Sequence, residues 1–213
     1  MRITVFGATG GVGREVVRQA LDAGHRVLAV VRDPDRLPVV HDHLEVVGVA
    51  GLTDPELLRP LVADSEAVVS GVGPTGRRNA DHVATTSTRS ILRALEGTPV
   101  ERLVTVSAAP VGPAPDGDSP LNRYVVLPLV GRALREVYAD LAVMEADIAR
   151  SGVPWTVVRP PKLVNRPRTG TYRRVIDGNV PRGHTISRAD TADAMLAALG
   201  DPGTVDRYVG IAY

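Results

Sequence analysis

The start of the chain combines a strand-like run, a glycine-rich turn and a helix-like run. The run Arg2–Phe6 ends in Gly7-Ala8-Thr9-Gly10-Gly11-Val12-Gly13, and apolar side chains then recur at helical spacing over Arg14–Ala23. The first glycine of the triplet permits a sharp exit from the strand, the second leaves room for a pyrophosphate, and the third lets helix and sheet pack closely. Free amides and the positive end of the helix dipole can hold phosphates there. The chain is therefore expected to open with a dinucleotide-binding βα unit, the alternative being a turn that uses glycine for geometry alone.

Strand-like and helix-like stretches alternate along the rest of the chain at intervals of roughly 20–30 residues. The expected strands are 2–6, 26–31, 44–47, 67–69, 102–106, 155–159 and 207–213, with a further short strand around 171–176. The expected helices are 14–23, a short helix opened by Asp54 and Pro55, 79–95, 132–150 and one capped by Ser187 that runs to 199. This alternation predicts an α/β fold with a parallel sheet covered by helices.

Two segments, 107–130 and 160–183, interrupt the alternation. The first contains five prolines between positions 110 and 128, and the second mixes loop with the short strand. Neither has the composition of a linker between domains. We therefore expect residues 1–213 to form a single NAD(P)-binding domain, in which these two segments lie on the substrate side.

The composition excludes several classes of site and partner. The chain has no cysteine, which excludes disulfides, zinc–thiolate sites and iron–sulfur clusters, and its five histidines are scattered, so we expect no bound metal. A net charge of +1 argues against a nucleic-acid surface. No apolar run approaches the roughly 20 residues that span a bilayer, and no signal peptide is evident. We expect a soluble cytoplasmic protein, a monomer or a homodimer, with no membrane or nucleic-acid partner.

The residue after the second expected strand bears on the choice of cofactor. In a doubly wound sheet the ligand lies over the carboxyl ends of the strands, where strand order reverses. A carboxylate at this place suits the ribose 2′-hydroxyl of NAD, whereas an arginine suits the 2′-phosphate of NADP. Here Arg32 comes first and Asp33 second. The order favours NADP(H) over NAD(H), the alternative being that Arg32 is an ordinary solvated arginine.

Other candidate residues follow the later strands or begin the long helix. Ser107 follows the fifth strand, where its hydroxyl could orient a carbonyl near the nicotinamide, or else bond local backbone. Lys162, the only lysine, could reach an anionic substrate or the cofactor, although lysines are usually solvated. The remaining candidates are Gly71, Val72, Gly73 and Pro160 for the cofactor, and Pro110 and His82 for the substrate. Turn geometry alone would also explain the glycines, and His82 could be an ordinary surface residue.

Together these features resemble the atypical short-chain dehydrogenase/reductase superfamily, in particular its compact NAD(P)H-binding group of flavin reductases and biliverdin-IXβ reductase. The motifs that carry the resemblance are the glycine turn 7–13, Val30-Val-Arg32-Asp-Pro, Val106-Ser107-Ala, Met144-Glu145, the segment 151–161 and Ile186-Ser-Arg-Ala-Asp190-Thr-Ala192. The resemblance covers nearly the whole chain. It implies a Rossmann-like, doubly wound sheet of seven or eight strands, with the pyrophosphate on the glycine turn and Arg32 near the 2′-phosphate.

The chain departs from the superfamily pattern at two places. The main branches carry a Tyr-x-x-x-Lys pair on the helix before the sixth strand, and those places fall here on Val137 and Leu141. Tyr138 is one residue away, so helical geometry turns it by about 100° from the expected face. The compact reductases commonly lack the pair too and take the proton from solvent. The other departure is Gly48-Val49, where relatives often place a carboxylate near the adenine.

The resemblance leads to one principal functional hypothesis and two alternatives. The principal one is an NADPH-dependent reductase that transfers hydride directly to a small-molecule acceptor, a flavin, quinone or conjugated carbonyl, with Ser107 polarising the acceptor. The first alternative is a redox sensor that binds NADP(H) without turnover. The second is a pathway isomerase or dehydratase that uses the cofactor transiently or structurally. Because fold alone does not determine function, the residues of the site must distinguish these hypotheses.

Overall fold

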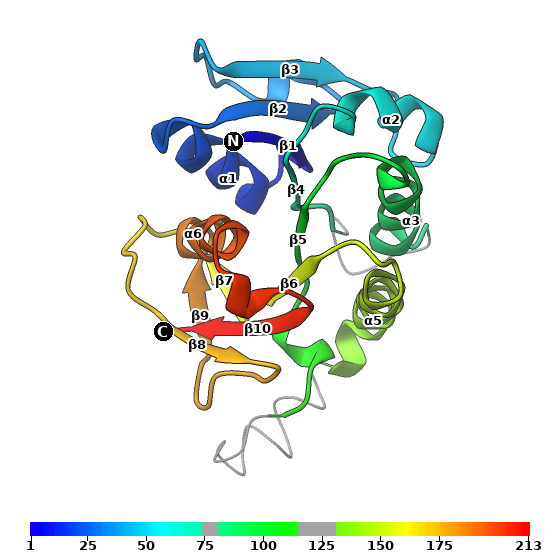
Figure 1. Cartoon of the computed structure of the whole chain (residues 1–213). Helices are drawn as coiled ribbons and strands as arrows, with labels where there is room; N and C mark the ends of the chain where they lie inside the picture. The colour runs from blue at the N-terminus through cyan, green and yellow to red at the C-terminus, as the bar shows by residue number, and fades with distance from the viewer. Residues whose placement is uncertain (74–80, 115–130) are drawn as a thin grey trace.

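The computed structural model describes residues 1–73, 81–114 and 131–213, and its centre is an eight-stranded sheet (Figure 1). In spatial order the strands are β3 (Leu44–Gly48), β2 (Arg26–Val31), β1 (Arg2–Phe6), β4 (Ala67–Ser70), β5 (Arg102–Val106), β6 (Trp155–Arg159), β10 (Arg207–Ala212) and β8 (Arg173–Ile176). Neighbouring strands are parallel, except that β8 runs antiparallel to β10 at the sheet edge. The structure thus confirms the predicted α/β fold with a doubly wound, Rossmann-like sheet.

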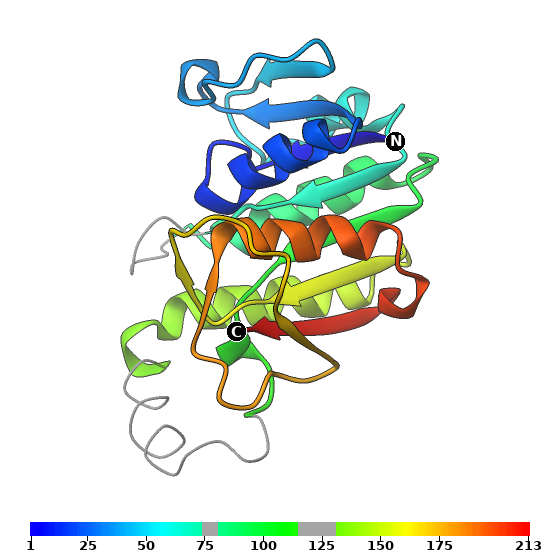
Figure 2. The same cartoon turned by 90° about the vertical axis from the view of Figure 1, so that its left-hand side faces the viewer.

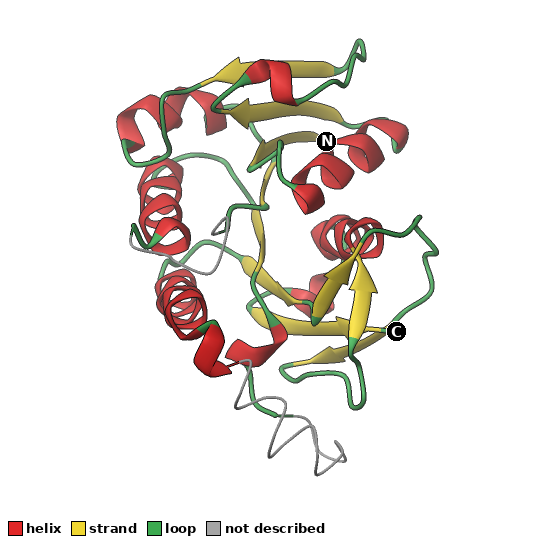
Figure 3. Ribbon diagram, turned by 180° about the vertical axis from the view of Figure 1, so that it is seen from behind, coloured by secondary structure: helices red, strands yellow, loops and turns green. Residues whose placement is uncertain are grey.

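Helices cover both faces of this sheet (Figures 1 and 3). On one face lie α1 (Gly11–Asp22) and α6 (Arg188–Leu199), and on the other lie α2 (Pro55–Val62), α3 (Val83–Leu95) and α5 (Arg135–Ala149). The central strands are buried on both sides, which explains their unbroken apolar runs. Two apolar cores result, one between the sheet and each helical layer. No helix in the described part of the chain is long and apolar enough to span a membrane.

The strand order reverses beside β1. The chain moves outward from β1 to β2 and β3, and then returns to place β4 on the opposite side of β1. The parallel register of β1 and β4 pairs Phe6 with Ser70, so the segments that follow both strands emerge at the same edge of the sheet (Figure 2). This edge is the topological switch point at which doubly wound folds bind ligands.

Several elements differ in extent from the sequence prediction. The helix expected over 79–95 begins at Val83, and residues 79–80 lie outside the described residues, as do residues 115–130 of the first irregular segment. The helix expected over 132–150 is Arg135–Ala149. The second irregular segment contains β7 (Lys162–Val164), which pairs in parallel with β9 (Thr185–Ser187) as a separate two-stranded sheet that was not predicted. Strands of three residues carry too little alternation to be recognised from sequence.

Candidate functional site

Two glycines of the first turn are required by close backbone packing. Gly7 has a φ of +73°, and a Cβ there would lie 2.8 Å from the carbonyl carbon of Gly71. A Cβ on Gly13 would lie only 2.2 Å from the carbonyl oxygen of Gly7. Gly71 in turn packs on this corner, since its own Cβ would lie 3.2 Å from the Gly13 nitrogen. Helix α1 can therefore approach β1 and β4 only because these three residues lack side chains.

The other glycines of the turn leave the start of α1 open. Gly10, the N-cap residue, has a φ of −72° and a ψ of 164°, a conformation that any residue adopts. Gly10 and Gly11 are both exposed, and no side chain of the described residues caps the helix. The first amides of α1 are thus available to an anion such as a phosphate.

Side chains already occupy the starts of α3 and α6. The buried Asp140 carboxylate accepts hydrogen bonds from the amides of Ala84 and Thr85, each at 2.9 Å. Ser187 Oγ accepts one from the Asp190 amide at 2.8 Å. Of these three helices, α1 is therefore the one whose N-terminus fits a dinucleotide phosphate.

Residues 71–73, which follow β4, were predicted to contact the cofactor, and part of this segment also has a role in packing. Gly71 belongs to the packed corner described above, Val72 is buried in the core, and a Cβ on Gly73 would meet nothing within 4 Å. Packing alone accounts for Gly71. A cofactor contact from these residues stays a prediction.

Three arginines lie in or beside the segment after β2. Arg32 is exposed, and the Asp33 carboxylate accepts a hydrogen bond from the Asp35 amide at 3.2 Å as the cap of η1 (Pro34–Arg36). Arg14 connects this segment to the glycine turn, because its Nη2 donates to the carbonyl oxygens of Thr9, at 3.4 Å, and Arg36, at 3.3 Å. The described residues offer none of these arginines an ion-pair partner. Arginines without an ion-pair partner among the described residues therefore lie where the second strand ends beside the turn, next to the carboxylates of Asp33 and Asp35.

Ser107 follows β5 directly and is buried. Its amide donates to the Val158 carbonyl at 2.8 Å, but its hydroxyl oxygen has no hydrogen-bond partner among the described residues. The hydroxyl thus makes none of the local backbone bonds that the alternative interpretation would require. A buried polar atom without a partner is costly, and a ligand is one way to satisfy it.

A cavity of about 640 Å³ begins at the next residue, Ala108. Its walls come from the carboxyl ends of β5, β6 and β10, the start of α5 and the segment 179–184. The predicted residues Pro110, Pro160 and Lys162 line it, and His82 is not among the described lining residues. His82 instead lies exposed at the N-cap of α3, with a φ of +46°. The structure therefore brings together the substrate-side candidates except His82.

Tyr138 also lines this cavity, one helical position away from the place at which the superfamily pattern puts its tyrosine. Leu134, the N-cap residue of α5, also lines this space, and its carbonyl accepts a hydrogen bond from the Tyr138 amide at 2.9 Å. Burial raises the pKa of the Tyr138 phenol. The phenol is therefore protonated at neutral pH and is a weak acid.

A buried ion pair that sequence reasoning missed supports one wall of the cavity. Arg159 Nε and Nη2 donate to the two carboxylate oxygens of Glu145, at 3.0 and 2.5 Å. Both side chains are more than nine-tenths buried, and the Arg159 Cζ lies 3.8 Å from the ring centroid of Tyr208. Asn179 fixes another wall, since its Nδ2 donates to the carbonyls of Ala109, at 2.7 Å, and Pro113, at 2.9 Å. The only signal in the sequence was that Glu145 and Arg159 stand in segments that carry the resemblance.

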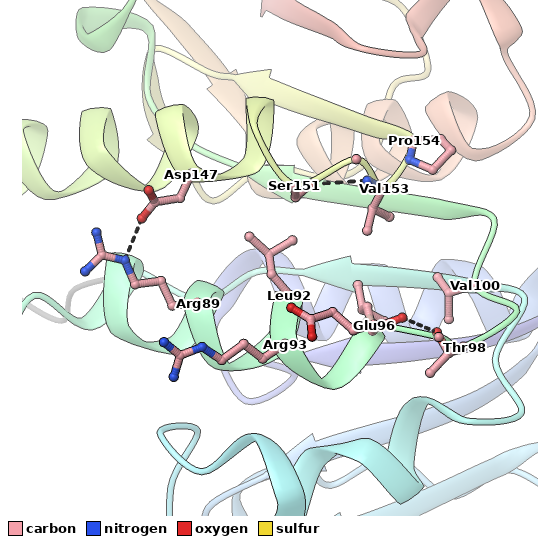
Figure 4. A pocket seen from close by; sticks show the side chains of 13 residues that line it. Arg89, Leu92, Arg93, Glu96, Thr98, Val100, Asp147, Ser151, Val153 and Pro154 are labelled. Atoms are coloured by element: carbon pink, nitrogen blue, oxygen red, sulfur yellow. Dashed lines mark hydrogen bonds and ion pairs between the residues drawn. The ribbon is translucent and has the colours of Figure 1, made fainter.

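A second cavity, of about 520 Å³, lies between α3 and α5 at the amino ends of β5 and β6 (Figure 4). Its wall includes Asp147, which Arg89 and Arg150 contact at 2.7 and 2.8 Å. Burial is the largest influence on the pKa of Asp147 and would raise it, but the hydrogen bonds and charges of the two arginines together lower it. None of the predicted site residues lines this cavity. The carboxyl edge of the sheet is therefore the candidate site.

Comparisons with known proteins define the class of protein. Residues 7–202 match the model of a family described as NAD(P)H-binding. The match covers most of the chain, including the glycine turn. The chain belongs to this NAD(P)H-binding family.

Individual proteins extend the comparison. The chain is 31% identical over 200 residues to a 3-diazoavenalumate denitrifying reductase of a Streptomyces species, covering 85% of this chain and 64% of the relative. A short-chain dehydrogenase/reductase of Veillonella parvula, solved in complex with NADP, has the same fold, with a TM-score of 0.82, 19% identity and coverage of 100% of this chain and 94% of that one. A structure described as an NADH-flavin reductase, from Streptococcus pneumoniae, gives a TM-score of 0.79, 20% identity and coverage of 100% and 99%. The chain shares the fold of these two solved structures, and the named relative is a reductase.

Proposed function

We propose that this protein is an NADPH-dependent reductase that transfers hydride directly to a small-molecule acceptor, a flavin, quinone or conjugated carbonyl compound. One observation carries the proposal. At a single edge of the sheet lie the uncapped start of α1, a cavity, and Ser107, whose buried hydroxyl oxygen has no partner in the described residues. A phosphate anchor, a polar group and a cavity match the needs of a dinucleotide and a second substrate.

Each part of this edge has a separate task in the proposal. The open amides of α1 bind the diphosphate, and Arg32 binds the 2′-phosphate because Asp33 is occupied as the cap of η1. When bound, NADPH supplies the hydride. Ser107 donates a hydrogen bond that orients the acceptor carbonyl, and the walls built on Arg159 and Asn179 hold the acceptor in the cavity.

The cavity walls indicate what kind of acceptor fits. They are largely aliphatic, their cationic or polar members include Arg159, Lys162, Arg182 and His184, and no carboxylate lines the described part. The aliphatic residues suit the apolar body of an acceptor, and the cationic residues suit an anionic group on it, while the proton comes from solvent. We propose further that the protein acts in the cytoplasm as a single dinucleotide-binding domain, a monomer or homodimer, with segments 107–130 and 160–183 on the acceptor side.

The proposal is tested by following the absorbance of NADPH with FMN, menadione or dichlorophenolindophenol as the acceptor. We expect NADPH to be oxidised only when an acceptor is present, at a rate proportional to the concentration of the protein. Tight NADPH binding without turnover on any acceptor would favour a redox sensor. Isomerisation of a substrate with catalytic NADP⁺ and no net change in absorbance would favour a pathway enzyme.

Replacement of Arg32 tests the choice of cofactor. Loss of a charge-assisted contact to a phosphate costs on the order of 1.5–3 kcal/mol, so Arg32→Ala should weaken NADPH binding about 10- to 100-fold. NADH lacks the 2′-phosphate, so its affinity should stay the same. Isothermal titration calorimetry with both dinucleotides measures the two effects. Equal affinity of the unmodified protein for NADPH and NADH would contradict the proposed role of Arg32.

A comparison of Ser107→Ala with Tyr138→Phe tests the catalytic group. A general acid contributes about 10²- to 10⁴-fold to turnover, and we expect Tyr138→Phe to lower turnover less than about tenfold because its phenol is a weak acid. Ser107→Ala should lower turnover more than Tyr138→Phe does. Both variants are measured with one acceptor at saturating NADPH, so that weaker binding is not mistaken for slower chemistry. Collapse of turnover in Tyr138→Phe with Ser107→Ala unaffected would instead establish a tyrosine-based mechanism.

A further inference from the structure

Arg188, the first residue of α6, lies across the glycine turn. A Cβ built on Gly11 would lie 2.5 Å from the Arg188 Cδ and 2.6 Å from its Nε. Gly11 is therefore the place where the arginine side chain passes over the first residue of α1. The guanidinium group consequently sits beside the helix N-terminus that stays uncapped among the described residues.

The position of Arg188 is determined by contacts on both sides of it. The buried Gln19 of α1 donates from Nε2 to the Ala189 carbonyl at 2.8 Å, which holds α1 and α6 side by side (Figures 1 and 2). Asn165 Oδ1 accepts a hydrogen bond from Arg188 Nη1 at 2.6 Å. The same first turn of α6 is anchored by the buried Asp190, whose carboxylate accepts from the amides of Thr169 and Gly170, each at 2.8 Å. The arginine is thus held against the turn before any ligand binds.

The charge of Arg188 is not neutralised within the described residues. Asn165 is its hydrogen-bond partner there, and a neutral amide leaves the positive charge in place. A guanidinium group carries five N–H donors, so four remain for other acceptors. A partly exposed cation with free donors beside open helix amides is the arrangement that a diphosphate binds.

We propose that Arg188, positioned by Asn165, is a binding residue for the diphosphate of the dinucleotide. The inference rests on the proposed cofactor site at the glycine turn and adds a cation from the opposite end of the chain. Its contact is common to NADPH and NADH, whereas that of Arg32 is specific to NADPH. The two arginines therefore have different roles. Arg188 contributes affinity for either dinucleotide, and Arg32 discriminates between NADPH and NADH.

Calorimetry with Arg188→Gln tests this division. Since a charged hydrogen bond to phosphate is lost, the affinities for NADPH, NADH and ADP should fall by similar factors, about 10- to 100-fold, while binding of adenosine should not change. Asn165→Ala removes only the side chain that holds the arginine, so it should weaken the same three ligands to a smaller degree. Arg18→Gln is the matched control, because it removes the same charge from the exposed face of α1 and should leave all affinities unchanged.

The outcomes separate this proposal from the function on which it rests. Unchanged NADPH affinity in both Arg188→Gln and Asn165→Ala would overturn the role of Arg188 alone, because the unmodified protein would still bind. Weaker NADPH binding with unchanged NADH and ADP binding would also overturn it, since Arg188 would then contact the 2′-phosphate. Failure of the unmodified protein to bind either dinucleotide would overturn the proposed cofactor site together with this inference.

Discussion

Gly10→Val is expected to abolish dinucleotide binding while the protein stays folded. The backbone of Gly10 is in the extended region, and its Cβ would meet only the carbonyl oxygen of Gly7, at 3.1 Å, and that of Gly71, at 4.0 Å. The fold can therefore accept a side chain there with a shift of a few tenths of an ångström. The same side chain would occupy the exposed space that the phosphates need. Calorimetry with NADPH measures the loss, and circular dichroism verifies the fold.

Gly13→Ala tests a glycine that the packing of the fold requires, in contrast to Gly10. Its Cβ would lie 2.2 Å from the Gly7 carbonyl oxygen, which is backbone and cannot move aside without separating α1 from β1. Although alanine is smaller than valine, we expect Gly13→Ala to lower the free energy of unfolding far more than Gly10→Val does. Urea unfolding of both variants measures the difference. If Gly10→Val bound NADPH as the unmodified protein does, the phosphates would have to lie elsewhere and the proposed site would be wrong.

Glu145→Ala is expected to destabilise the protein by about 3–5 kcal/mol, because it leaves the buried Arg159 guanidinium without its bidentate partner. The midpoint of urea unfolding measures the effect. Glu56 provides the control, since its carboxylate is exposed and lies 3.9 Å from Arg59. Glu56→Ala should change stability by no more than about 1 kcal/mol.

A double variant shows whether the unpaired buried charge causes the loss of stability in Glu145→Ala. If an uncompensated buried charge is responsible, replacing both partners in Glu145→Leu/Arg159→Met should recover much of the stability lost in Glu145→Ala. A double variant as unstable as the single one would show that packing around Tyr208 matters more than the charge. Because Arg159 lines the cavity, we also expect Glu145→Ala to impair acceptor reduction more than NADPH binding.

The elements that the sequence predicted well are those specified by their own residues. The run 26–31 reads as a strand because a parallel strand buried on both faces must be apolar throughout, and it is β2. Asp54 and Ser187 were predicted to cap helices, and both side chains do so. The short strands β7 and β9 escaped prediction because their pairing joins segments about twenty residues apart, and neither strand has an apolar pattern of its own.

The candidate site also contains residues that local sequence patterns predicted and residues that only tertiary contacts brought together. The glycine turn and the positions of Ser107, Pro110, Pro160 and Lys162 at the carboxyl edge follow from the order of strands and turns. The sequence did not show that Tyr138 lines the cavity, because an offset on one helix does not say where the neighbouring loops build the cavity wall. The pairing of Glu145 with Arg159 and the approach of Arg188 to Gly11 join separate elements, so no local pattern reports them.

The sequence by itself determined the class of fold, the glycine turn and the edge of the sheet at which the candidate site lies, because backbone conformation and burial impose local rules on residue type. Only the tertiary structure decided which charges are neutralised and which are left for a ligand. Arg159 and Arg188 are both arginines at the carboxyl edge, yet one is buried against a carboxylate and the other is held by a neutral amide beside open helix amides. That difference depends on which distant side chain folds against each guanidinium, and it is what makes the first structural and the second available for binding.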